Sequence, residues 1–134
     1  MAASVRPFLL FQDGKAEEAL TFYTSLIPGS RIDHVERYDA NGPGAEGTVF
    51  RATFTLADQT VLCTDSIARH DFTFTPAFSF WVECESDAQL EQLLSALAQG
   101  GMVHMPPDDY GFSRRFAWVA DRFGVSWQLN LSRP

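Results

Sequence analysis

The sequence has very little lysine and no long apolar run. Lys15 is the only lysine among 134 residues, and ten Lys and Arg stand against seventeen Asp and Glu, which gives a formal net charge of −7. Binding to a phosphate backbone needs clustered cations, so we expect no nucleic-acid partner. No apolar run approaches the roughly 20 residues that span a bilayer, so we expect no membrane partner either.

Cysteine is also scarce, and the first residues lack the features of a leader. Residues 1–7 contain one arginine and no apolar stretch, which argues against a secretory signal. Cys63 and Cys84 are too few for a disulfide scaffold. We therefore expect a cytoplasmic protein with reduced cysteines. Its composition, 46% hydrophobic and 20% charged, is typical of a globular chain, and its length suits one domain.

What the chain has in plenty is phenylalanine, with twelve copies, and a repeated pattern of strands and helices. Apolar periodicity and turn residues predict the same order of elements twice. The first copy has strands over 8–12, 31–38, 48–56 and 59–65 and a helix from Ala16. The second has strands over 78–84, 102–105, 116–120 and 125–131 and a helix after Ser86.

The spacing of matching residues supports a tandem repeat. Phe8 and Phe78 are 70 positions apart, and so are Leu20 and Leu90. The prediction is an α+β fold of two tandem β-α-β-β-β modules, about 5–66 and about 74–132. One such module is too small to bury both faces of its sheet, so the modules must cover each other or pair with a second chain.

Six stretches spread over nearly the whole chain carry a family resemblance. They are Pro7–Phe11, Ala16–Tyr23, Glu36–Tyr38, Gly42–Gly47, Phe74–Phe80 and Asp121–Gln128. In these stretches the chain resembles the PhnB-like branch of the vicinal-oxygen-chelate superfamily, which includes the glyoxalases, bleomycin-resistance proteins and dioxygenases. The resemblance implies curved mixed sheets around a cleft, a homodimer and a small-molecule ligand. Many such proteins carry the description 3-demethylubiquinone-9 3-methyltransferase.

The resemblance also implies one divalent ion, held by His and Glu from the first and last strands of the modules. Gln128 takes the place of the final-strand glutamate, four residues after Gly124, and an amide oxygen is a weaker ligand than a carboxylate. The strands that start near Pro7 and Ala77 contain no histidine. A catalytic ion needs about three protein ligands. We therefore expect no metal and no other cofactor. The alternative is a lyase, dioxygenase or thiol-transfer enzyme with a non-standard metal shell.

Gly42, Gly44 and Gly47 match the letters of a G-x-G-x-x-G nucleotide fingerprint. That fingerprint needs a helix N-terminus after it, whereas Thr48 begins a predicted strand and Pro43 removes one N–H donor. The segment is predicted to be a mobile hairpin loop. A methyltransferase activity, the third possibility, is disfavoured because a methyl-donor-binding architecture is missing.

Alternation along the last strand supplies the first candidate site residues. Ser126, Gln128 and Asn130 alternate with Val125, Trp127 and Leu129. We expect the apolar face to pack under a helix and the polar face to point into the cleft. A strand that simply faces solvent would show the same pattern.

Tyr110, His70 and Cys63 complete the candidates. Tyr110 lies in a loop over 108–115, which is either a lid or a solvated segment whose charges pair locally. His70, next to Asp71, is either a surface histidine or a base. Cys63 and Cys84 are expected to be small buried hydrophobes, and Cys63 stays a ligand-binding candidate because its strand should line the cleft. Flanking carboxylates should raise the pKa of the Cys84 thiol.

These patterns predict a small-molecule-binding protein of the PhnB-like type and identify no catalytic residue. The ligand-binding candidates are Gln128, Tyr110, Ser126, Cys63, His70 and Asn130.

Overall fold

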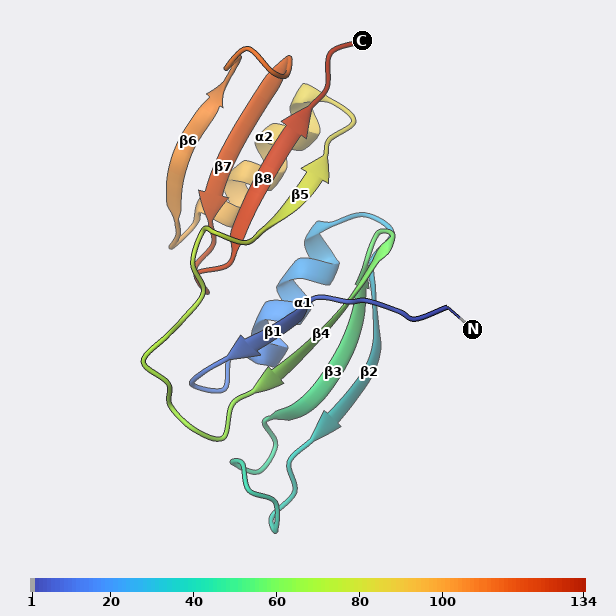
Figure 1. Ribbon diagram of the computed structural model, residues 1–134, viewed down its shortest axis with the longest axis vertical. Helices are drawn as coiled ribbons and strands as arrows, with labels where there is room; N and C mark the ends of the chain where they lie inside the picture. The colour runs from blue at the N-terminus through green and yellow to red at the C-terminus, as the bar shows by residue number, and fades with distance from the viewer. Residues whose placement is uncertain (1) are drawn as a thin grey trace. The chain divides into compact units, whose positions relative to one another are not determined.

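The computed structural model describes residues 2–134, which form two compact units. The first ends at His70 and the second runs from Asp71 to Pro134, so the division falls between the two predicted modules. Each unit consists of one four-stranded mixed sheet with one helix on one of its faces (Figure 1). The predicted β-α-β-β-β repeat is thereby confirmed.

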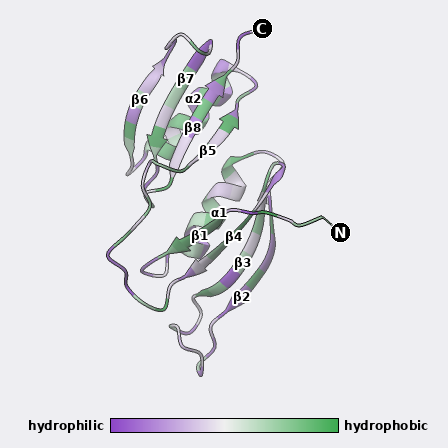
Figure 2. Cartoon of the chain, in the orientation of Figure 1, coloured by the Kyte–Doolittle hydropathy of each residue, from purple (hydrophilic) through white to green (hydrophobic). Residues whose placement is uncertain are grey.

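In the first unit the strand order is β1-β4-β3-β2. Its elements are β1 (Phe8–Phe11), α1 (Ala16–Leu26), β2 (Arg31–Arg37), β3 (Val49–Leu56) and β4 (Gln59–Asp65). β1 is parallel to β4, and the other pairs are antiparallel. β1 consists entirely of apolar residues, as its colour in Figure 2 shows. The core lies between α1 and the sheet, where the ring centroids of Tyr23 and Phe54 are 6.4 Å apart.

In the second unit the strand order is β5-β8-β7-β6. Its elements are β5 (Ser79–Glu83), α2 (Asp87–Ala98), β6 (Met102–Asp108), β7 (Arg115–Ala120) and β8 (Ser126–Leu131). The apolar face of α2 is buried on the sheet through Leu90, Leu93, Leu94 and Leu97. Two reciprocal bonds start α2: the Ser86 hydroxyl at the N-cap accepts from the Gln89 N–H, and the Gln89 side chain accepts from the N–H of Glu85, one residue before the cap.

The repeat differs by one residue from the predicted spacing. The helices begin at Ala16 and Asp87, 71 positions apart rather than 70. Phe8 is the first residue of β1, whereas Phe78 precedes β5. The difference matters because a shift of one position moves every side chain of a strand to the other face of its sheet.

Within residues 2–134, no helix has both the length and the apolar character needed to cross a membrane.

Candidate functional site

The candidate site is the face of the second sheet that α2 does not cover, here called the open face. Alternation along β8 divides its side chains between the two faces. Trp127 and Leu129 are buried on the α2 side, and Phe80 of β5 packs on Trp127 with ring centroids 4.9 Å apart. Ser126, Gln128 and Asn130 therefore lie on the open face, as the sequence predicted.

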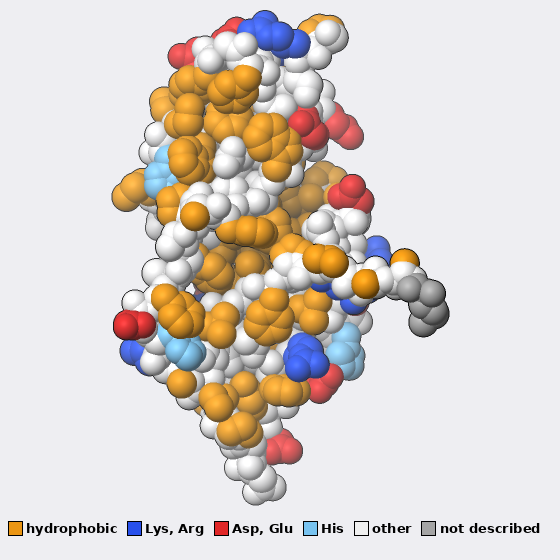
Figure 3. All heavy atoms as spheres, viewed as in Figure 1, with side chains coloured by type: hydrophobic (Ala, Val, Ile, Leu, Met, Phe, Trp, Pro, Cys, Tyr) orange, Lys and Arg blue, Asp and Glu red, His pale blue; other side chains and the backbone are white. Residues whose placement is uncertain are grey.

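An aromatic cluster occupies part of the open face. Phe116 of β7 is its centre, with ring centroids 4.9 Å from Phe112, 5.8 Å from Trp81 and 6.1 Å from Tyr110. Trp81, Phe112 and Tyr110 are 51%, 58% and 37% exposed, so the cluster is open to solvent while Phe116 is buried beneath it. Figure 3 shows hydrophobic side chains gathered over this sheet. Exposed rings in contact with one another are typical of a ligand-binding surface.

A polar row crosses the sheet beside this cluster. The Trp118 indole donates to the Ser126 hydroxyl at 2.8 Å, and the hydroxyls of Ser126 and Ser79 are 2.6 Å apart. The Gln128 side-chain amide donates to the Ser79 hydroxyl at 3.2 Å. Ser126 is 1% exposed, whereas Ser79 and Gln128 are half-buried and reach the surface. The row therefore places two neutral hydrogen-bonding side chains, Ser79 and Gln128, where a ligand can touch them.

Glu83 of β5 binds the last of the predicted polar residues, Asn130. The Asn130 side-chain amide donates to both carboxylate oxygens, at 3.1 and 3.2 Å, and the Trp81 indole donates at 2.8 Å. The bond from Trp81, helped by those from Ser132 and Asn130, lowers the pKa of the Glu83 carboxyl despite its partial desolvation. Asn130 is 4% exposed and is occupied by these bonds, so it supports the open face rather than presenting a free group to a ligand.

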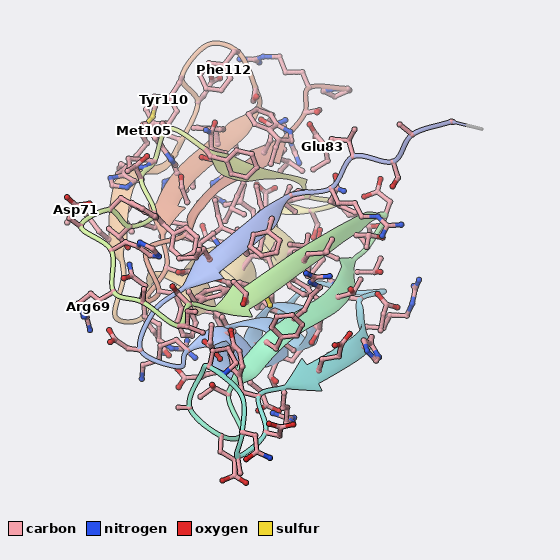
Figure 4. All side chains as sticks on the ribbon, turned by 60° about the horizontal axis from the view of Figure 1, so that its bottom comes forward. Arg69, Asp71, Glu83, Met105, Tyr110 and Phe112 are labelled. Atoms are coloured by element: carbon pink, nitrogen blue, oxygen red, sulfur yellow. The ribbon has the colours of Figure 1, made fainter. Side chains whose placement is uncertain are left out.

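The loop that carries Tyr110 lies against the aromatic cluster. The Tyr110 ring is stacked on Phe112 at an interplanar angle of 17°, and its hydroxyl donates to the backbone carbonyl of Pro106. Figure 4 shows Tyr110, Phe112 and Met105 on one side of the unit and Glu83 on the other. At the C-terminal side, Arg133 binds Asp109 at 2.8 Å. The loop thus has local charge pairing together with an aromatic anchor; its role as a lid stays a prediction.

His104 of β6 is the histidine of the open face. A register shift between Val103 and Met105 marks a β-bulge at His104, and bulges re-aim side chains. Its ring centroid is 5.0 Å from that of Trp118, and its Nε2 is a buried atom with no hydrogen-bond partner within residues 2–134. His104 therefore packs against Trp118 rather than presenting its Nε2 to solvent.

Cys63 and His70 belong to the first unit, so neither is part of the open face of the second sheet. Cys63 lies on the α1 side of its sheet and is 0% exposed, because alternation turns its side chain into the core, so the expectation of a small buried hydrophobe is confirmed. The His70 Nε2 lies 3.0 Å from the Ser66 hydroxyl, and its backbone N–H donates to Gln12 at 2.8 Å. These contacts fix the turn after β4.

Both thiols should be unreactive in the folded protein. Burial, together with the charge of Asp65, raises the pKa of Cys63 to about 12. Burial, with a further contribution from Glu83, raises that of Cys84 to about 11. Since the thiolate is the nucleophile, iodoacetamide at pH 8 should leave both cysteines unmodified in native protein and alkylate both in urea, measured by intact mass. Native alkylation of Cys63 at the denatured rate would contradict this placement.

Several open-face residues were not identified from the sequence. Ser79, Trp81 and Glu83 alternate along β5 with the buried Phe80 and the half-buried Val82, and Trp118 lies between two buried residues of β7. The signal that could have found them is the period-two alternation applied to β8. It was available for β5, because polar and exposed positions alternate there with Phe80 and Val82.

Comparison with solved structures defines the class of protein. The fold matches a glyoxylase/bleomycin resistance protein/dioxygenase domain from Frankia sp. EAN1pec at a TM-score of 0.65, with 17% identity over 99% of each chain. It also matches protein PA1353 from Pseudomonas aeruginosa at a TM-score of 0.85, with 24% identity over 99% of this chain and 100% of that one. The molecule has the glyoxalase/bleomycin-resistance fold of the vicinal-oxygen-chelate superfamily.

The family follows from sequence as well as structure. The model of the 3-demethylubiquinone-9 3-methyltransferase family matches residues 3–130. A PhnB protein from Bacillus cereus is 51% identical, with a TM-score of 0.93 over 97% of this chain and 100% of that one. No curated protein sequence matches the chain. The chain belongs to the 3-demethylubiquinone-9 3-methyltransferase family, the PhnB-like branch of the superfamily, as its sequence resemblance predicted.

Proposed function

We propose that this protein binds a small, mostly apolar aromatic molecule on the open face of the second sheet. The supporting observation is the exposed aromatic cluster of Trp81, Tyr110, Phe112 and Phe116 beside the neutral polar row that ends at Gln128. Aromatic side chains provide the contact area, and a few polar groups fix the orientation of the bound molecule. The homodimer and the cytoplasmic setting stay predictions.

Our proposal includes no metal centre of the superfamily type on this face. The mutant fosfomycin resistance protein FosX from Listeria monocytogenes, which shares the fold at a TM-score of 0.59 with 12% identity, is complexed with Mn(II). Here the donors around Gln128 are the hydroxyls of Ser79 and Ser126, which are neutral and already hydrogen-bonded to one another. Glu83 is engaged by Trp81 and Asn130. Because such neutral oxygen donors bind divalent ions weakly, this set does not fit the ion.

Methyl transfer, the activity in the family's description, receives no support from the glycine-rich segment. Gly47 is followed by β3 rather than by a helix, and the Gly47 N–H donates to the Tyr38 carbonyl within the loop. The segment is the loop that joins the antiparallel strands β2 and β3, and its mobility stays a prediction. A methyltransferase would require a methyl donor to bind elsewhere. Saturable binding of S-adenosylmethionine in calorimetry would favour methyl transfer over the binding function proposed above.

The experiment is an NMR titration of the indole N–H signals with 2-naphthol. The chain has three tryptophans, of which Trp81 and Trp118 lie on the open face and Trp127 lies in the core. We expect saturable shifts at Trp81 and Trp118 and little change at Trp127, with the same dissociation constant after EDTA treatment. Absence of saturable shifts at both open-face indoles would refute the binding site, and a large loss of affinity with EDTA would refute its independence from metal.

A pair of variants locates the site on the cluster. Trp81→Ala should weaken 2-naphthol binding about tenfold, because about 1–1.5 kcal/mol of ring contact is lost. The control is Phe50→Ala, which removes a ring that is 42% exposed in the first unit and should leave the affinity unchanged. Equal losses in the two variants would place the binding elsewhere.

A further inference from the structure

The hydrogen atoms of the polar row can be assigned from the burial of its members. Ser126 accepts a hydrogen bond from the Trp118 indole and is 1% exposed, so its own hydroxyl hydrogen needs an acceptor inside the protein. Within residues 2–134, the acceptor in reach of that hydroxyl is the Ser79 oxygen at 2.6 Å. Ser126 therefore donates to Ser79. The opposite direction would leave a buried hydroxyl hydrogen without a partner.

This direction leaves the Ser79 hydroxyl hydrogen free at the surface. The Ser79 oxygen accepts from Ser126 and from the Gln128 amide at 3.2 Å, which fills both of its lone pairs. Its hydrogen bonds no other group within residues 2–134, and the half-buried position of Ser79 gives it access to the open face. Ser79 is thus a pre-aligned hydrogen-bond donor.

Gln128 supplies the complementary acceptor beside it. Its side-chain nitrogen donates to Ser79, so the amide oxygen of the same group takes no part in that bond. That oxygen accepts no hydrogen bond within residues 2–134, and it is not buried. The Ser79 hydroxyl as donor and the Gln128 oxygen as acceptor therefore lie next to each other. Trp81, on the adjacent strand β5, is the residue that pairs with Gln128.

We infer that the open face selects an aromatic ring system carrying an amide edge, in which a ring carbonyl lies next to a ring N–H. The Ser79 hydroxyl donates to the carbonyl of the ligand, and the Gln128 carbonyl accepts from its N–H, while the rings of the aromatic cluster contact the apolar part. This inference rests on the proposed function and adds the chemical class of the ligand. Each of the two bonds matches one free group of the protein, so a ligand that lacks the N–H leaves the Gln128 oxygen unpaired.

The test compares 2-quinolone with N-methyl-2-quinolone, which keeps the ring and the carbonyl and carries a methyl group in place of the N–H hydrogen. Dissociation constants come from the indole N–H signals of Trp81 and Trp118. Wild-type protein should bind 2-quinolone about tenfold more tightly, the usual effect of one hydrogen bond to a site that is otherwise left unpaired. Gln128→Leu should abolish the preference, whereas Gln128→Glu, which keeps an acceptor oxygen, should retain it.

The matched control is Gln92→Leu, at an exposed position of α2, which should retain the tenfold preference. Equal affinities of the two quinolones in the wild type would overturn the amide-edge inference while leaving the proposed function intact, since a ring is still bound. Absence of binding by both quinolones and by 2-naphthol would overturn the inference and the proposed function together.

Discussion

Asp121→Ala should destabilise the second unit by about 3–4 kcal/mol, because it removes the hydrogen bonds that a buried carboxylate accepts. Asp121 is 3% exposed and lies in the turn between β7 and β8. One carboxylate oxygen accepts from the N–H groups of Phe123 and Val125 at 2.9 and 3.1 Å, and the other accepts from the Trp127 indole at 2.9 Å. Urea unfolding followed by circular dichroism measures the loss.

The sequence itself offers the control for this substitution. Asp58 occupies the same place in the first copy of the repeat, in the turn between β3 and β4, but it is exposed. Asp58→Ala should change the free energy of unfolding by less than about 0.5 kcal/mol. The bond to Trp127 is isolated by the double-mutant cycle with Trp127→Phe, which should give a coupling of about 1–2 kcal/mol to Asp121. Similar effects of Asp58→Ala and Asp121→Ala would contradict this account.

The contrast between Asp58 and Asp121 shows how far the sequence could predict the fold. Turn residues and apolar periodicity located the strands and both helices, because these elements depend on local sequence patterns that occur in both copies of the repeat. They could not show which aspartate is buried. That depends on Trp127, whose indole reaches the turn only after β7 and β8 have paired.

For the candidate site, the sequence predicted which side chains share a face of β8 but not which of them remain free to bind. Ser126 and Asn130 point to the open face as expected, yet both are buried and bonded to residues of β5. Gln128 remains free to bind through its carbonyl oxygen. The difference comes from the parallel pairing of β5 with β8, a contact between segments 47 residues apart, which no local pattern specifies.

Asp65→Ala should destabilise the first unit by about 3 kcal/mol, because Asp65 caps α1 from a distance. Lys15 at the N-cap position of α1 makes no side-chain capping bond. Instead, Asp65 at the end of β4 accepts from the Ala16 N–H at 2.9 Å through one oxygen and from the Val49 N–H at 2.8 Å through the other. Its negative charge also lies at the positive end of the helix dipole.

The N-terminus of α1 is therefore capped by the distant Asp65, whereas that of α2 is capped by the adjacent Ser86, so Asp65→Ala should affect α1 alone. In Asp65→Ala, amide exchange should accelerate in the first turn of α1 and at Val49, while α2, capped locally by Ser86, keeps its protection. Asp39→Ala is the matched control, since Asp39 is exposed and its carboxylate accepts the Asn41 N–H. Its effect on the free energy of unfolding should stay below about 1 kcal/mol. Unchanged protection at Ala16 in Asp65→Ala would show that the helix does not depend on this carboxylate.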